Sequence, residues 1–116
     1  MHFDTDIYQT VERLGDALLA AGANMPRNVK PLLGGRLFDE TVMMALLIRN
    51  AAIARGHAKV PYYDELLQEI EATQFMLKRA FANRYLSPSA YSATLPLTES
   101  VARQANGLRS KFVSAP

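Results

Sequence analysis

Apolar residues recur at intervals of three and four along most of this chain, the spacing that gathers side chains on one face of an α-helix. A first helix is expected over about residues 4–23, with a stripe formed by Ile7, Val11, Leu14 and Leu18. Gly22 lies near its end, and Pro26 follows soon after, where proline disfavours helical backbone in the preceding residue. The pattern predicts an amphipathic helix with one buried face.

A second helix is expected over about residues 30–55, with one face formed by Leu33, Leu37, Met44, Ile48 and Ala51. The continuous run at 42–48, Val-Met-Met-Ala-Leu-Leu-Ile, adds apolar residues on its other faces. A helix that is apolar most of the way round must be covered on more than one side. Two interpretations stay open: a subunit contact through Val42, Met43 and Leu46, or the best-buried helix of a monomer.

A third helix is expected over about residues 61–85, with an inward stripe of Leu66, Leu67, Ile70, Leu77 and Phe81. Phe75 and Met76 fall off this stripe and suggest a second buried contact.

A fourth helix is expected over about residues 88–112, because Ser87 is a good N-cap and Pro88 suits the first helical position. Its stripe consists of Tyr91, Leu95, Thr98, Val101, Ala105, Leu108 and Phe112. Pro96 lies within this pattern and is expected either to kink the helix or to delay its regular part by a turn.

These four segments, without strand alternation or an internal repeat, predict an all-α protein. Short links favour antiparallel neighbours, so we expect a single antiparallel up-down-up-down four-helix bundle over residues 1–116. The chain contains no cysteine, which excludes disulfides and thiolate metal sites. Its beginning lacks a signal-peptide pattern and no apolar run is long enough to cross a bilayer, so a cytoplasmic location is expected.

Residues that could hold a metal or catalyse a reaction do not form a recognisable pattern. His2 and His57 are far apart and have no acidic partner at ligand spacing. The glutamates Glu65, Glu69 and Glu71 lack the Glu-x-x-His pattern of di-iron bundles, and are expected to complement the dipole at the start of the third helix. We therefore expect no enzymatic activity, no cofactor and no metal.

Charge lies in blocks along the chain, although the formal net charge is only +2. An up-down-up-down bundle would place the links after the first and third helices at the same end. That end, called the basic end below, is expected to collect Arg27, Lys30, Arg36, Lys78, Arg79 and Arg84. The opposite end is expected to be mixed, with Asp4, Asp6, Asp64 and Glu65 facing Arg55, Lys59, Arg109 and Lys111.

Two explanations of the basic end remain open. Basic residues near a helix C-terminus complement the helix dipole, which accounts for the three cations near the end of the third helix without a ligand. It does not account for the three cations before and at the start of the second helix, where positive charge is mildly unfavourable. An anionic partner would account for all six, and nucleic-acid phosphate is the natural candidate because bound Lys and Arg release condensed counterions.

Several short motifs together resemble a known family. They are Ile7-Tyr8-Gln9, Met25-Pro26-Arg27-Asn28, Leu47-Ile48-Arg49-Asn50-Ala51, Phe75-Met76-Leu77-Lys78-Arg79-Ala80, Leu86-Ser87 with Tyr91, and Val101-Ala102-Arg103 with Gly107. Their set and spacing are similar to the four-helix-bundle family that includes the accessory variability determinant of diversity-generating retroelements. Relatives of that family are the bundle proteins encoded in intervening sequences of large-subunit ribosomal RNA genes.

This resemblance implies a homopentamer that associates with a reverse transcriptase and with RNA or DNA through a basic surface. By matched position, it implies that Lys78, Arg84 and Arg103 contact nucleic acid. Oligomerisation would use the off-stripe apolar residues Val42, Met43, Leu46, Phe75 and Met76. The alternative expectation is a bundle that only mediates contacts between proteins, with its charges serving as dipole complements.

Overall fold

A computed structural model describes residues 5–116 and contains four α-helices and no strand within that range. They are α1 (Thr5–Ala23), α2 (Gly35–Ile53), α3 (Val60–Ala82) and α4 (Pro88–Phe112). A π-helical turn, Lys30–Gly34, leads into α2, and a 3-10 turn, Gly56–Lys59, leads into α3. The prediction of an all-α protein is therefore confirmed for the described residues.

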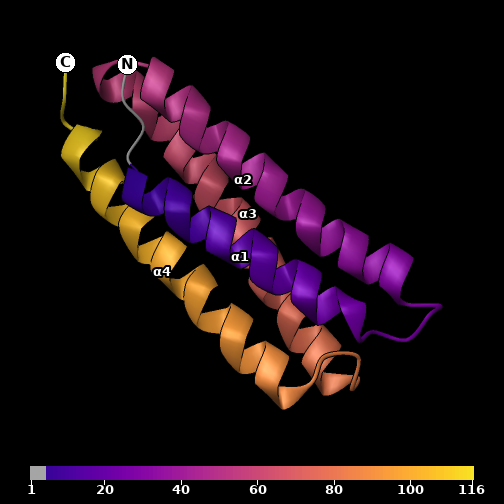
Figure 1. Ribbon diagram of the computed structural model, residues 1–116. Helices are drawn as coiled ribbons and strands as arrows, with labels where there is room; N and C mark the ends of the chain where they lie inside the picture. The colour runs from indigo at the N-terminus through magenta and orange to yellow at the C-terminus, as the bar shows by residue number, and fades with distance from the viewer. Residues whose placement is uncertain (1–4) are drawn as a thin grey trace.

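The helices pack side by side into an elongated bundle measuring 49 × 21 × 19 Å (Figure 1). α1 packs on α2 and α4, and α3 packs on the same two helices. The link between α2 and α3 lies at the end of the bundle where the chain terminates, and the backbone N–H of His57 donates a hydrogen bond to the carbonyl of Pro116. No helix among the described residues is both long enough and apolar enough to span a membrane.

One core runs the length of the bundle and contains most of the residues that the periodicity selects. Its fully buried members include Ile7, Leu14, Leu18, Leu37, Met44, Leu66, Ile70, Leu77 and Val101. Buried threonines extend it, because each hydroxyl donates to a carbonyl of the preceding turn, as in the 2.9 Å bond from Thr94 to Ala90. Phe81 departs from the expected stripe: it is 39% exposed and stacks on Tyr91, with ring centroids 4.4 Å apart.

The start of α2 differs from the expected boundary because the chain winds as a π-helical turn before it. Pro31 lies in this turn and has no N–H to donate to a regular α-helical ladder. Gly34 ends the turn against α1, where a Cβ on Gly34 would lie 3.7 Å from the Cα of Gly22. This distance is an ordinary van der Waals contact between the turn and α1.

α3 ends three residues earlier than expected because Arg84 adopts a left-handed backbone conformation, with φ of 63°. The N–H of Arg84 donates to the carbonyl of Phe81, and the N–H of Tyr85 donates to the carbonyl of Ala80. This pair of bonds is a Schellman motif, which ends a helix and satisfies two of its last carbonyls.

α4 begins where the sequence predicts, since the Ser87 side chain accepts a 3.0 Å hydrogen bond from the N–H of Ala90. The helix continues through Pro96 without a break, so the expected delay of its regular part does not occur.

Candidate nucleic-acid interface

The basic end is built from two links and the helix turns beside them. Arg27 and Lys30 lie between α1 and α2, and Arg36 lies in the first turn of α2. Lys78 and Arg79 lie near the end of α3, and Arg84 lies in the link to α4. All six side chains are exposed.

Five of these six cations form no ion pair with any described residue. The two ion pairs that the described residues form are Arg36 with Glu40 and Arg109 with Asp64. The remaining members of the basic end, called the unpaired cations below, are Arg27, Lys30, Lys78, Arg79 and Arg84. None of the five has a carboxylate of a described residue within ion-pair distance, so each can pair with an anion from outside the chain.

Arg36 is the one cation of the basic end that forms an ion pair with a described residue. Its Nε donates to Oε1 of Glu40 at 2.9 Å, one turn along α2, and this bond raises the pKa of Arg36. Arg36 therefore already has a carboxylate partner, and we leave it out of the group of unpaired cations.

Glu40 belongs to a carboxyl cluster between α2 and α3 that the sequence did not reveal. Its side chain is only 7% exposed. Its buried Oε2 has no hydrogen-bond partner among the described residues. Across the interface, hydrogen bonding to Glu40, burial and the Glu40 charge raise the pKa of Glu69 to about 7. Protonation of Glu69, which the raised pKa favours below about pH 7, would provide a donor beside the buried carboxylate of Glu40.

This cluster corrects the expected role of Glu69. The residue lies beside Arg36 and Glu40 of α2, rather than serving only to complement the dipole of α3. The described residues contain no group of three or more His, Cys, Asp or Glu side chains that could hold a metal ion. His57 is exposed, and His2 and Asp4 lie outside the described residues.

Arg103 lies apart from the basic end. It is exposed on α4, about 22 Å along the helix axis from Pro88 at about 1.5 Å per residue. Its neighbour Gln104 donates a 3.0 Å hydrogen bond to Thr10 near the start of α1. The structure therefore does not bring Arg103 together with the other predicted contacts.

The predicted oligomer residues fall into two groups. Val42, Met43 and Leu46 on α2 are between 44% and 46% exposed, and Phe75 on α3 is 67% exposed. Met76 is different, because it is half-buried and packs against the core, so the second contact expected for it lies within the chain. Ile53, at 53% exposure, extends the α2 group, since it lies seven residues after Leu46 on the same face.

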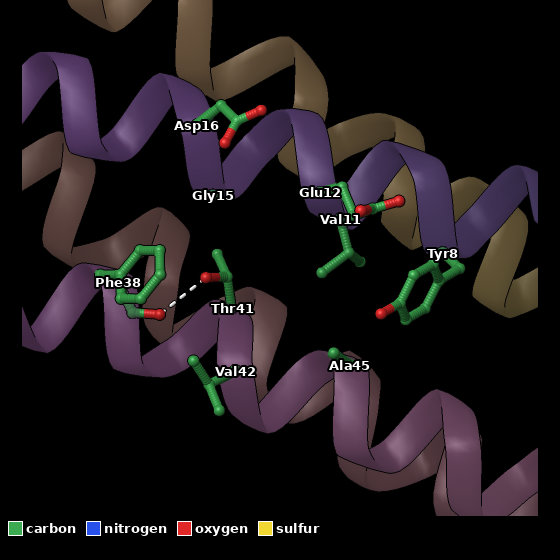
Figure 2. Close-up of a pocket in the computed structure, with 9 residues that line it drawn as sticks. All are labelled: Tyr8, Val11, Glu12, Gly15, Asp16, Phe38, Thr41, Val42 and Ala45. Atoms are coloured by element: carbon green, nitrogen blue, oxygen red, sulfur yellow. Dashed lines mark hydrogen bonds between the residues drawn. The ribbon is translucent and has the colours of Figure 1, made fainter.

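A groove of about 230 Å³ separates the facing sides of α1 and α2 (Figure 2). It is lined by Tyr8, Val11, Glu12, Gly15, Asp16, Phe38, Thr41, Val42 and Ala45. Its floor is closely packed, because a Cβ on Gly15 would lie 3.3 Å from Oγ1 of Thr41. The carboxylates of Glu12 and Asp16 at its edge disfavour phosphate, so this groove is not part of the candidate interface.

No protein-family model matches the chain, and no curated protein matches it. The family resemblance therefore remains a prediction from the sequence.

Proposed function

We propose that this chain is a non-enzymatic accessory protein of a diversity-generating retroelement that binds RNA or DNA backbone through its basic end and associates with the reverse transcriptase. The observation that carries the proposal is the presence of five exposed cations without a carboxylate partner in the two links and adjoining turns of one end. Dipole complementation alone would not place Arg27 and Lys30 before a helix N-terminus, where positive charge is unfavourable.

The proposed topology is an antiparallel up-down-up-down bundle. Short links between consecutive helices support it, as does the course of the chain in Figure 1. In this topology the two links that carry Arg27, Lys30 and Arg84 share one end, so one nucleic-acid strand could contact cations from both.

The proposed assembly is a homo-oligomer, a pentamer by family resemblance. Its contact would use the outer face of α2, where Val42, Leu46 and Ile53 lie in line with Met43 beside them. Exposed apolar groups of this kind are a common feature of protein–protein contacts. Light scattering of the wild-type protein and of Leu46→Glu tests this, because the proposal predicts an oligomer that the variant disrupts. A wild-type monomer would contradict it.

Fluorescence anisotropy with a mixed-sequence RNA and the same DNA sequence tests nucleic-acid binding. The proposal predicts binding to both, with an affinity that falls steeply between about 50 mM and 200 mM salt because phosphate contacts release counterions. Absence of binding at the lower salt concentration would contradict the proposal.

A second candidate function, a scaffold that binds only proteins, is favoured by the exposed apolar face of α2. The same titration separates the two functions, since the scaffold has no reason to bind RNA. Co-purification with a reverse transcriptase in the absence of nucleic acid would then support the scaffold.

A further inference from the structure

A pocket of about 400 Å³ lies at the basic end, between the end of α1 and the start of α4. Its lining residues are Ala17, Ala20, Ala21, Asn24, Arg84, Tyr85, Ser87, Ser89, Ala90 and Ala93. Sequence patterns do not predict this pocket, because its lining comes from segments more than 50 residues apart in the chain. Its volume falls within the range of about 300–1,000 Å³ that is typical of small-ligand sites.

Two kinds of surface meet in this pocket. Five of the ten lining residues are alanines of α1 and α4, whose short side chains leave an apolar space between the helices. The other five are polar or aromatic: an amide, two hydroxyls, a guanidinium and a phenol. An apolar floor beside amide and hydroxyl groups suits a flat heterocycle that also carries hydrogen-bonding edges.

The two residues best suited to a nucleotide are adjacent in the chain. Arg84 is exposed and forms no ion pair with the described residues, so its guanidinium is available to a phosphate. Tyr85 is 39% exposed, and its ring offers a face on which a base could stack. The Schellman bonds from Arg84 to Phe81 and from Tyr85 to Ala80 fix the backbone of both residues beside the pocket.

The backbone at Arg84 is itself unusual. Among the described residues it is the one non-glycine residue with a positive φ, at a position that helices usually give to glycine. A residue with a side chain is strained there, and such strain often persists at functional sites. Glycine would relieve the strain but would remove the guanidinium from the pocket.

We infer that the pocket between α1 and the α3–α4 link binds one unpaired nucleotide of a nucleic-acid strand, with the base stacked on Tyr85 and its phosphate paired with Arg84. This inference rests on the proposed function and deepens it, since it selects single strands over duplex. A base inside a duplex is stacked on both faces and cannot enter the pocket, whereas an unpaired base can be turned out into it.

The test compares binding of a short single-stranded RNA and of a blunt RNA duplex of the same composition by fluorescence anisotropy. Tyr85→Ala is expected to weaken single-strand binding about tenfold through loss of stacking, and to leave duplex binding nearly unchanged. Tyr85→Phe keeps the ring and is expected to bind like the wild type.

A second variant fills the pocket without changing charge. Ala93→Leu places a larger side chain on an exposed, pocket-lining position of α4, and is expected to weaken single-strand binding about as much as Tyr85→Ala. Ala72→Leu is its matched control, because Ala72 is equally an exposed helical alanine but lies on α3 outside the pocket. This control should bind both probes like the wild type.

The outcomes separate this inference from the proposed function. Wild-type single-strand affinity in both Tyr85→Ala and Ala93→Leu would overturn the nucleotide pocket, while salt-dependent binding of both probes would still support backbone contact by the basic end. If the wild-type protein bound neither the single-stranded nor the duplex probe, both the nucleotide pocket and the proposed function would be overturned.

Discussion

The two ends of this bundle both carry several cations, but they differ in what those cations contact. At the end near the chain termini, Arg109 pairs with Asp64. At the same end Lys59 donates a 2.7 Å hydrogen bond to the carbonyl of Ala51, and its Nζ lies 5.3 Å from the ring centroid of Phe112. At the basic end, five of six cations have no carboxylate partner among the described residues. Arg55 and Lys111, at the end near the termini, also form no ion pair with a described residue, so the two ends differ through the contacts of Arg109 and Lys59.

The links at the two ends differ in the residue that adopts a left-handed backbone conformation. Each contains a residue with a positive φ: Gly56 at 54° near the chain terminus, and Arg84 at 63° at the basic end. Glycine adopts this conformation without strain, so the first link is built for stability. The second link has an arginine at a strained position. Strain of this kind often occurs at functional sites, in line with the proposed contact of Arg84 with nucleic acid.

Substitution at these two positions should have opposite effects on stability. Gly56→Ala is expected to lower the free energy of unfolding by about 2 kcal/mol, because of the positive φ and because its Cβ would clash with the Pro116 carbonyl oxygen. Arg84→Gly is expected to raise the free energy of unfolding by about 0.5–1 kcal/mol and to weaken RNA binding. Urea denaturation followed by circular dichroism measures both. A loss of stability in Arg84→Gly would contradict this account of the basic-end link.

The carboxyl cluster of Glu40 and Glu69, which lies beside Arg36, leads to a prediction about pH. The pKa of Glu69 is about 7 in the folded protein, above the value of about 4.3 expected when unfolded, so the folded state binds the proton more tightly. The stabilisation of the folded protein by the proton on Glu69 is complete below about pH 4 and is lost as the pH rises through 7. Unfolding stability should therefore fall by about 1–2 kcal/mol between pH 5 and pH 8, after allowance for solvent screening.

Glu69→Gln provides the control for this pH dependence, because an amide can donate to Glu40 but does not titrate near neutral pH. The variant should be more stable than the wild type at pH 8 and should show a flatter profile in urea denaturation. An unchanged profile in Glu69→Gln would assign the pH dependence to another group.

Removal of single lysines should sharpen the comparison further. Lys59→Ala is expected to lower the free energy of unfolding by about 1 kcal/mol, because it removes a hydrogen bond to a carbonyl near the end of α2 and a cation–π contact. Lys30→Ala, at the basic end, is expected to change stability by less than about 0.5 kcal/mol, since this side chain has no partner to lose. Equal losses of stability in urea denaturation would mean that the two ends do not differ as described.

Much of the fold could be predicted from the sequence because its signals are local. The stripe from Ile7 to Leu18 and the cap at Ser87 each depend on residues within a few turns, and the structure confirms both. The early end of α3 depends on an arginine in a left-handed conformation, which residue preference does not favour. Its position could not be read from periodicity.

The candidate interface was only partly predictable. The block pattern of charge indicates which cations lie at the basic end. It does not indicate which of them form ion pairs, because pairing depends on neighbours in space. The bond from Arg36 to Glu40 is evident only in the structure of α2. The cluster of Glu40 with Glu69 joins two helices and has no sequence signature. No sequence pattern predicts a role for Tyr85, because its place in a pocket depends on α1 packing beside the α3–α4 link.

The central claim is that the unpaired cations of the basic end contact nucleic-acid phosphate, and the salt dependence of RNA affinity tests it most directly. Lys78→Glu combined with Arg84→Glu reverses two charges at the basic end, whereas Arg55→Glu combined with Lys111→Glu reverses two exposed charges at the other end. The account predicts that the first pair weakens binding and reduces the slope of log K against log salt by about 1.5, while the second pair leaves the slope nearly unchanged. Equal slopes in the two double variants would contradict it.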